Sequence, residues 1–297
     1  MSAPASTPAP HSRPAIAAIL PRSAARDAAG RLTIAGCALA DVAAAAGTPA
    51  LILDEGELRA TAREYVEAFS SRWPRSSVYF ASKALSCSGV ISVFADCGLG
   101  CDVASAGELA VALAGGMAPE RILLHGNAKR DADLQAALDA GVGLIVVDSL
   151  DELARLERLA RRSQRLLLRV NPSVAAPTHA AMATGHEDSK FGLPLDQLRE
   201  AVARIAQAPL LELEGLHAHI GSQILELEPF THAARVLTEL DASASLSTFD
   251  FGGGLGVRYL PDEPEPPSVE QYSERLVAAV RELLPVGARI IVEPGRS

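Results

Sequence analysis

The stretch Val78–Leu85, VYFASKAL, contains the pattern on which the fold prediction rests. Its apolar residues are typical of a buried strand, and the strand candidate leads directly into a lysine, Lys83. A Rossmann sheet has a glycine-rich turn after its first strand. SKALSCSG follows here instead, so the stretch favours another α/β fold, in which a strand presents a lysine at its carboxyl end.

The same pattern continues along the chain from about Gly47: short β-branched or aliphatic runs are followed by amphipathic stretches of helical period. Acidic residues cluster at the starts of the helix candidates, and Gly or Pro often follows their ends. The eight strand candidates are residues 78–82, 101–105, 121–126, 144–148, 166–170, 213–220, 248–253 and 289–295. Eight strands that alternate with helices predict an α/β fold of the TIM-type (β/α)8 barrel class more readily than an open doubly wound sheet.

Both ends of the chain depart from a self-contained barrel. Residues 1–46 are predicted to be a disordered tail, rich in Pro, Ala and Ser, with an N-terminal extension, and residues 47–297 to be the barrel domain. Residues 47–69 are predicted to form an extra strand and helix outside the eight. The chain stops a few residues after the eighth strand, so we expect a truncated form without the closing helix.

The composition is that of a globular protein with a sizeable core, because 48% of the 297 residues are hydrophobic. The net charge of −9 argues against general affinity for nucleic acid or anionic membranes, which reward dense Lys and Arg clusters. No apolar run approaches the ~20 residues that span a bilayer, and no secretory signal precedes the four cysteines. We therefore expect a cytoplasmic protein with reduced thiols and a small-molecule partner.

Lysine is rare in this chain: three of the 27 basic residues are lysines, namely Lys83, Lys129 and Lys190. Unlike arginine, lysine can lose its proton when it is desolvated and can form a Schiff base. The alternative for Lys83 is a strand-end side chain that extends to water. If Lys83 is a nucleophile, its partners must lie at the ends of the other strands.

In a barrel of this type the chemistry lies at the carboxyl ends of the strands. The residues predicted at these ends are Lys83, Asp102, Ser105, His125, Asn127, Asp148, Arg169, Asn171, His217, His219, Asp250, Gly252, Gly253, Gly254, Glu293 and Arg296. His217 and His219 share one face of a strand, but a third ligand at a fixed offset is lacking, so no metal is predicted. A structural histidine is the alternative for His217.

A phosphate site is predicted after the seventh and eighth strands. Gly252–Gly254 can bring backbone N–H groups close to an anion, although a tight turn would use the same glycines. Arg296 offers a planar fork for phosphate, and Ser222 offers a hydroxyl. Glu293 beside an anion needs a cation, which the protonated ring nitrogen of pyridoxal phosphate (PLP) would supply; an ion pair with Arg296 is the alternative.

Eight motifs in register resemble those of the diaminopimelate decarboxylase family, PLP enzymes with an alanine racemase-like barrel. The motifs are YFASKAL, CDVASAGELA, ILLHGNAK, IVVDSLDEL, HEDSKFGL, GLHAHIGSQ, DFGGGLGVRYLP and VEPGRS. The resemblance implies that Lys83 binds PLP covalently, that His219 stacks on the cofactor ring and that Glu293 pairs with the ring nitrogen. It also implies a group of cofactor-binding residues around the phosphate, namely Ser222, Gly252, Gly253, Gly254, Pro294, Gly295 and Arg296, with Arg296 also near the substrate.

The reaction implied by the resemblance is the decarboxylation of meso-2,6-diaminopimelate to L-lysine and CO₂, the last step of lysine biosynthesis. Family members continue into a C-terminal β domain that completes the site across a homodimer. That domain is missing here, so we expect this chain to be unstable or nearly inactive. HEDSKFG, with Lys190, and HGNAK, with Lys129, are family loop motifs without an assigned role.

Three other functions stay open at this point. The chain could belong to a related decarboxylase that acts on ornithine, arginine or carboxynorspermidine. It could be a non-catalytic barrel that binds PLP, or a structural or regulatory remnant without cofactor. Covalent labelling of Lys83 would exclude the last of these, and release of CO₂ would exclude the last two.

Overall fold

The computed structural model describes residues 19–172, 191–240 and 246–297 of the chain. Contacts within the chain divide it into two compact units. The larger unit comprises residues 58–257 and 266–297, and the smaller unit comprises residues 1–57 and 258–265.

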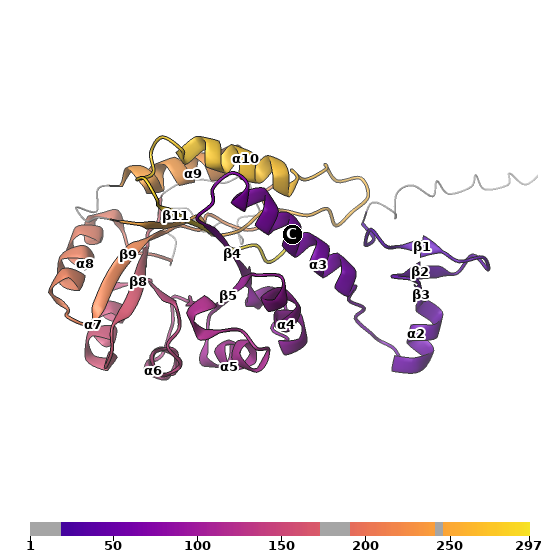
Figure 1. The fold of residues 1–297 in the computed structure, drawn as a ribbon, viewed down its shortest axis with the longest axis horizontal. Helices are drawn as coiled ribbons and strands as arrows, with labels where there is room; N and C mark the ends of the chain where they lie inside the picture. The colour runs from indigo at the N-terminus through magenta and orange to yellow at the C-terminus, as the bar shows by residue number, and fades with distance from the viewer. Residues whose placement is uncertain (1–18, 173–190, 241–245) are drawn as a thin grey trace, which may run out of the picture. The chain divides into compact units, whose positions relative to one another are not determined.

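Eight parallel strands close into a barrel in the larger unit (Figure 1). They follow one another around the ring in chain order, and the last strand pairs with the first. The strands are β4 (Ser76–Ala81), β5 (Gly100–Val103), β6 (Ile122–Leu124), β7 (Leu144–Val147), β8 (Gln164–Arg169), β9 (Leu211–His217), β10 (Thr248–Asp250) and β11 (Arg289–Val292). Each of the eight strand candidates overlaps one of these strands, so the predicted (β/α)8 barrel is confirmed.

The side chains of each strand alternate between the inside of the barrel and the layer under the helices, as the period of two requires. In β7, Leu144 and Val146 belong to the small apolar cluster of buried residues that includes Leu123 and Ile291. Ile145 and Val147 belong instead to the large core cluster, which also contains helix residues. A strand that is covered on both faces consists of consecutive apolar residues. The run LIVV of β7 therefore predicted a buried strand clearly.

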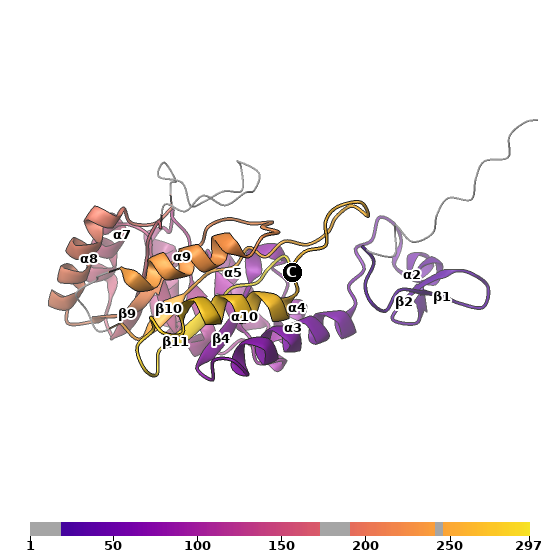
Figure 2. The ribbon, with the colours of Figure 1, turned by 90° about the horizontal axis from the view of Figure 1, so that it is seen from above.

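Helices connect the strands and surround them (Figure 1). They are α3 (Glu55–Ser70), α4 (Ser88–Asp96), α5 (Ala106–Ala114), α6 (Asp131–Ala140), α7 (Leu150–Leu159), α8 (Leu195–Gln207), α9 (Glu228–Glu239) and α10 (Val269–Val280). Serine side chains cap three of them: Ser105, Ser149 and Ser268 each accept a hydrogen bond from a backbone N–H in the first turn. Helices α9 and α10 lie side by side in both ribbon views (Figure 2).

The smaller unit contains secondary structure that the sequence analysis did not predict. Strands β1 (Ala25–Arg26), β2 (Leu32–Ile34) and β3 (Cys37–Ala38) form a small antiparallel sheet, followed by α2 (Leu39–Ala46). The extra strand predicted after Gly47 is wrong, whereas the predicted helix is α3. Residues 48–54 pair with no strand in the described ranges, and Leu51 is 80% exposed, so the apolar run there does not signal a sheet.

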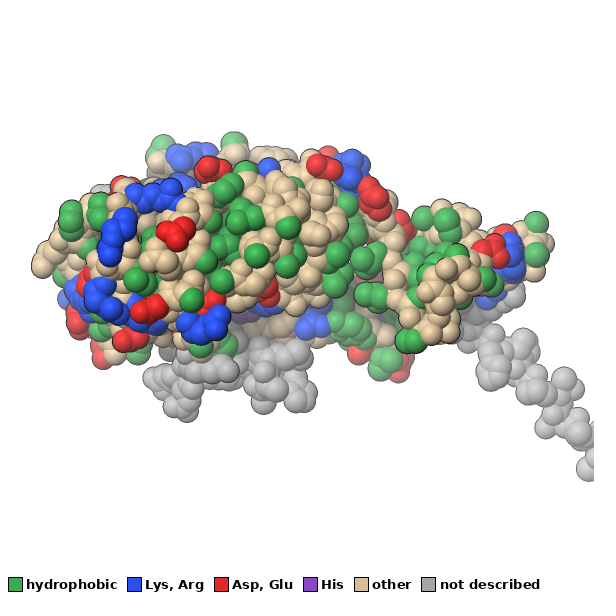
Figure 3. Space-filling model, turned by 90° about the horizontal axis from the view of Figure 1, so that it is seen from below, with side chains coloured by type: hydrophobic (Ala, Val, Ile, Leu, Met, Phe, Trp, Pro, Cys, Tyr) green, Lys and Arg blue, Asp and Glu red, His purple; other side chains and the backbone are tan. Residues whose placement is uncertain are grey.

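The surface carries mixed charges. Figure 3 shows one face, on which basic and acidic side chains are interspersed among apolar ones. Several arginines are paired, for example Arg204 with Glu157 at 2.8 Å and Arg59 with Asp96 at 3.3 Å. Within the described ranges, every helix is too short or too polar to cross a membrane.

Candidate active site

Lys83 lies at the carboxyl end of β4, in the short 3₁₀ helix η1 (Ser82–Ala84). The side chain is exposed and, among the described residues, forms no hydrogen bond or ion pair. Its charge nevertheless acts on the interior of the barrel. Burial raises the pKa of Glu293, and the positive charges of Lys83 and Arg169 oppose that rise. An accessible amine in electrostatic range of a buried carboxylate fits a nucleophile better than a lysine that extends to bulk water.

The end of β11 lies directly against the end of β4. The backbone N–H of Ala81 donates to the carbonyl of Pro294 at 2.9 Å. A Cβ added at Gly295 would lie 2.9 Å from the Cβ of Ala81, closer than side chains tolerate. The glycine thus lets the segment that carries Glu293 and Arg296 pack against the segment that carries Lys83.

The glycine run after β10 also packs closely against neighbouring loops. A Cβ at Gly253 would lie 1.9 Å from the carbonyl oxygen of Glu293, and one at Gly254 would lie 2.3 Å from that of Gly221. Gly252 and Gly254 also have positive φ angles, 64° and 121°. The turn and the close approach of three loops therefore both require these glycines, and the binding of an anion by their N–H groups stays a prediction.

The N–H groups of this run are not equivalent. Gly252 donates to Asp250 Oδ1 at 2.9 Å, and Gly253 donates to His219 Nδ1 at 3.2 Å. The N–H of Gly254 has no such partner among the described residues. Gly254 is therefore the member of the run whose N–H can bind an anion.

Arg296 and Ser222 meet as the phosphate prediction requires. Arg296 Nε donates a hydrogen bond to Ser222 Oγ at 3.1 Å. Because Gly221 is packed against Gly254, the serine, the arginine and the last glycine come from three loops that converge. A guanidinium, a hydroxyl and a backbone N–H are the donor set of a phosphate site. Glu293 lies 2.5 Å from His125 and 3.5 Å from His217, so the structure places this carboxylate beside two histidines. An ion pair with Arg296 stays the alternative.

His219 is half-buried beside this site. Since Nδ1 accepts the hydrogen bond from Gly253, the ring proton belongs on Nε2. Burial lowers the pKa of His219 well below its ordinary value, and the charges of Lys83 and Arg169 lower it further. The ring is therefore neutral and held in one orientation, as a stacking platform needs.

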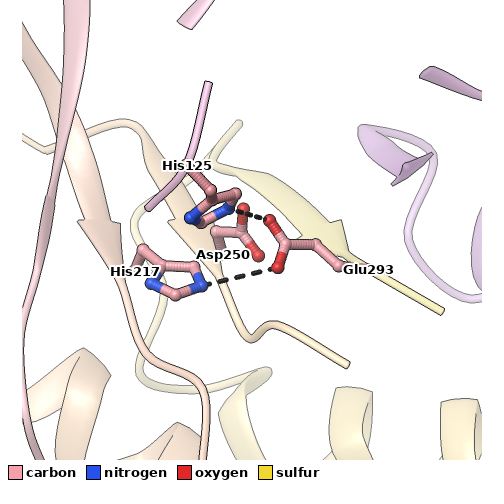
Figure 4. Close-up of side chains that lie close together, drawn as sticks. All are labelled: His125, His217, Asp250 and Glu293. Carbon is pink, nitrogen blue, oxygen red and sulfur yellow. Dashed lines mark hydrogen bonds and ion pairs between the residues drawn. The ribbon is translucent and has the colours of Figure 1, made fainter. Parts of the chain in front are cut away.

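Four buried side chains form a cluster inside the barrel mouth (Figure 4). They are His125, His217, Asp250 and Glu293, and their ligand atoms all lie within 4.8 Å of one another. His125 Nε2 lies 2.5 Å from Glu293 Oε1, and His217 Nε2 lies 3.5 Å from Glu293 Oε2. Two imidazoles and two carboxylates could also hold a divalent cation, so the absence of a metal stays a prediction.

Desolvation controls the charge of this cluster. Burial lowers the pKa of His125 to about 3 and lowers that of His217 well below its ordinary value. Burial also raises the pKa of Asp250 well above its ordinary value, and the neighbouring Glu293 raises it further. Burial thus favours the neutral forms of both histidines and of Asp250. Burial raises the pKa of Glu293 as well, but the hydrogen bond from Asp250 and the positive charges of Lys83 and Arg169 oppose that rise and favour its charged form.

Three further residues near the strand ends, Asp148, Arg169 and Lys129, make structural contacts. Asp148 lies 3.6 Å from Arg169 and accepts a hydrogen bond from the N–H of Gly192 at 3.0 Å. Lys129 has no side-chain exposure and pairs with Glu152 at 2.7 Å. Its role is thus to hold the loop after β6, whereas Lys190 lies outside the described residues. The sequence had placed His125 at a strand end but gave it no partner.

A barrel with an accessible lysine, a phosphate-type donor set and a buried carboxylate at one mouth defines a protein built to bind PLP. The chain belongs to the pyridoxal-dependent decarboxylase family, because its residues 56–297 match the model of that family's pyridoxal binding domain. The predictions of the family and of a PLP cofactor are thereby confirmed.

Within this family, the chain is similar to several diaminopimelate decarboxylases. A diaminopimelate decarboxylase of Actinosynnema pretiosum subsp. auranticum is 45% identical over 278 residues, which cover 90% of this chain and 62% of the relative. One of Mycobacterium tuberculosis (strain ATCC 25618 / H37Rv) is 41% identical, over 94% of this chain and 66% of the relative. The crystal structure of the Helicobacter pylori diaminopimelate decarboxylase complexed with L-lysine superposes with a TM-score of 0.81 at 30% identity, covering 86% of this chain and 66% of that one. This chain therefore spans a little under two thirds of the length of the first relative.

Proposed function

We propose that this chain is the PLP-binding barrel of a decarboxylase that converts meso-2,6-diaminopimelate to L-lysine and CO₂. The observation that carries the proposal is the placement of Lys83. It is an accessible amine two residues after Ala81, whose backbone N–H donates to Pro294 in the loop that presents Glu293 and Arg296. The relatives supply the substrate class, since those reported above are named diaminopimelate decarboxylases.

Different residues of the chain would bind different parts of the cofactor. Lys83 would bind the cofactor covalently through its amine, and Arg296, Ser222 and the Gly254 N–H would hold the phosphate. Glu293, with its negative charge, would face the ring nitrogen, and the neutral ring of His219 would stack on the cofactor. When bound, PLP supplies an electron sink for the pair released as the carboxylate leaves as CO₂.

Orientation is the second contribution of the site. Decarboxylation is fastest when the breaking bond lies perpendicular to the plane of the sink. The loops around the site are joined by backbone hydrogen bonds, including one from Glu293 N–H to the carbonyl of Gly252 at 2.8 Å. Such loops would hold the stacking, phosphate and carboxylate groups in fixed relation. Arg296 would also lie near the substrate, as the family resemblance implies.

Borohydride reduction of the purified chain with PLP, followed by peptide mass spectrometry, tests the binding step. We expect a pyridoxyl group on Lys83, and its absence would refute the proposal. Release of CO₂ from meso-2,6-diaminopimelate, compared with ornithine and arginine, tests the substrate. Labelling at Lys83 without release of CO₂ from any of them would leave a barrel that binds PLP without catalysis. Cytoplasmic location and homodimeric assembly stay predictions.

A further inference from the structure

The carboxylate of Glu293 lies among buried groups that come from three other strands (Figure 4). Its side chain is 5% exposed, and a buried carboxylate requires hydrogen-bond partners to stay ionised. The closest contact is with His125, at 2.5 Å, whereas His217 lies at 3.5 Å, beyond a good hydrogen bond. His125 is therefore the histidine that determines where this carboxylate points.

His125 is itself held in place. It follows β6, which lies three strands away from β11 in the barrel, so the contact with Glu293 crosses the mouth. Its backbone N–H donates to the carbonyl of Val103 at 2.7 Å. Its ring packs edge-on against His217, with ring centres 4.6 Å apart. A ring fixed by these contacts can impose an orientation on a flexible glutamate.

His125 contacts one oxygen of the carboxylate and fixes its orientation. His125 Nε2 lies against Oε1, whereas Oε2 lies 3.5 Å from His217 Nε2, and the carboxyl of Asp250 shares a hydrogen bond with Glu293. A neutral imidazole that donates through Nε2 also stabilises the ionised carboxylate. This arrangement is what a carboxylate needs in order to pair with a positive ring nitrogen.

We propose that His125 is a positioning residue that aims the ionised Glu293 carboxylate at the ring nitrogen of bound PLP. The proposal rests on the proposed function, because it concerns the same cofactor. It adds a residue from the opposite side of the barrel whose effect is transmitted through Glu293 alone. Consequently, the contribution of His125 to cofactor binding should vanish when the ring nitrogen is removed.

The test compares PLP with its 1-deaza analogue, in which carbon replaces the ring nitrogen. His125→Leu removes the donor, and His125→Gln keeps a donor nitrogen near the position of Nε2. Loss of a hydrogen bond to a charged group should weaken PLP binding by about tenfold in His125→Leu. Binding of the deaza analogue should be unchanged, and His125→Gln should recover most of the PLP affinity. Dissociation constants come from absorbance titrations in EDTA, which removes any metal held by the same cluster.

A double-mutant cycle shows whether Glu293 transmits the effect. We expect Glu293→Gln to lose the preference for PLP over the deaza analogue, and His125→Leu to cause no further loss in that background. His232→Gln, an exposed histidine on α9, is the control and should bind both ligands as the unchanged chain does. If His125→Leu does not fold by circular dichroism, His125→Asn, whose amide is too short to reach Glu293, carries the same expectation.

Three outcomes would overturn the proposal. Equal losses for PLP and the deaza analogue would mean that His125 only packs in the barrel. Additive losses in the double variant would mean that it acts independently of Glu293, and unchanged PLP affinity would mean that it has no role in binding. Failure of the unchanged chain to bind PLP at Lys83 is a separate result, which would refute the proposed function instead.

Discussion

Replacing Lys129 by methionine should lower the unfolding free energy by about 3 to 5 kcal/mol, the usual result of breaking a buried ion pair from one side. The Lys129 amine is wholly buried and makes three contacts. It donates to Glu152 at 2.7 Å, to the carbonyl of Gly126 at 2.6 Å and to that of Val146 at 2.7 Å. Methionine fills a similar volume but leaves a 1% exposed carboxylate and two carbonyls without their donor.

Thermal and urea unfolding at pH 7 measure this loss. At about 2.1 cal/mol/K per residue, a chain of 297 residues has an unfolding entropy of about 0.6 kcal/mol/K, so Tm should fall by about 5 to 8 °C. Arg130→Met is the matched control. Arg130 is the next residue and is 75% exposed, so water screens its pair with Asp133 and its loss should be much smaller than that of Lys129.

A second variant separates charge from packing. Lys129→Met combined with Glu152→Leu removes both charges, and its loss should be smaller than the sum of the two single losses by at least about 2 kcal/mol. The reasoning is refuted if Lys129→Met loses no more stability than Arg130→Met, or if the two single losses simply add.

Three further predictions concern the mouth of the barrel. Gly253→Ala should lower Tm strongly and weaken PLP binding, since its Cβ would lie 1.9 Å from the Glu293 carbonyl, whereas Gly107→Ala, with 3.7 Å to its nearest neighbour, should be tolerated. A third prediction concerns the pH dependence that His125 adds. Burial holds the pKa of His125 at about 3, against an ordinary 6.5, so between pH 7 and pH 5 the unfolded state binds the proton that the folded state does not, whereas the raised pKa values of Asp102 and Asp250 act in the opposite direction. In urea titrations, the stability of the unchanged chain relative to His125→Gln should therefore fall toward pH 5 by up to about 1.4 kcal/mol per pH unit, and a difference that stays constant with pH would contradict the prediction. Arg296→Gln should weaken PLP binding at least about tenfold but leave the affinity for pyridoxal, which has no phosphate, unchanged.

The fold could be predicted from sequence because most barrel strands contain a short apolar run and are separated by helices of amphipathic sequence. LIVV and RIIV are covered on both faces, so their hydrophobicity has no other explanation. The failure after Gly47 has the opposite cause. An apolar run such as Leu51–Leu53 resembles a strand locally. A strand forms only where another strand pairs with it, and the sequence of the run does not show whether such a partner exists.

A site residue could be predicted where its position in the sequence, at the end of a strand, was enough to place it in the site. Lys83, Glu293 and Arg296 follow strand ends, and all strand ends of a parallel barrel meet at one mouth. Contacts between distant residues were not predictable in this way. His125 and Glu293 are 168 positions apart, and only the register of the barrel brings their side chains to 2.5 Å. The sequence therefore predicted the groups that are proposed to meet the cofactor, but not the contact between His125 and Glu293.

The glycines show why the mouth of the barrel can be both crowded and rigid. Gly253 and Gly295 allow the loops after β10, β11 and β4 to approach until backbone atoms touch, and the hydrogen bonds of Gly252 and Pro294 then join these loops. Every group proposed to hold the cofactor phosphate or ring stands on one of these loops or on the Gly221 loop beside them. A substitution at a glycine should therefore disturb several cofactor contacts together, whereas one at Arg296 or His125 should remove a single contact. The difference between these two patterns of loss can be measured with the same set of PLP analogues.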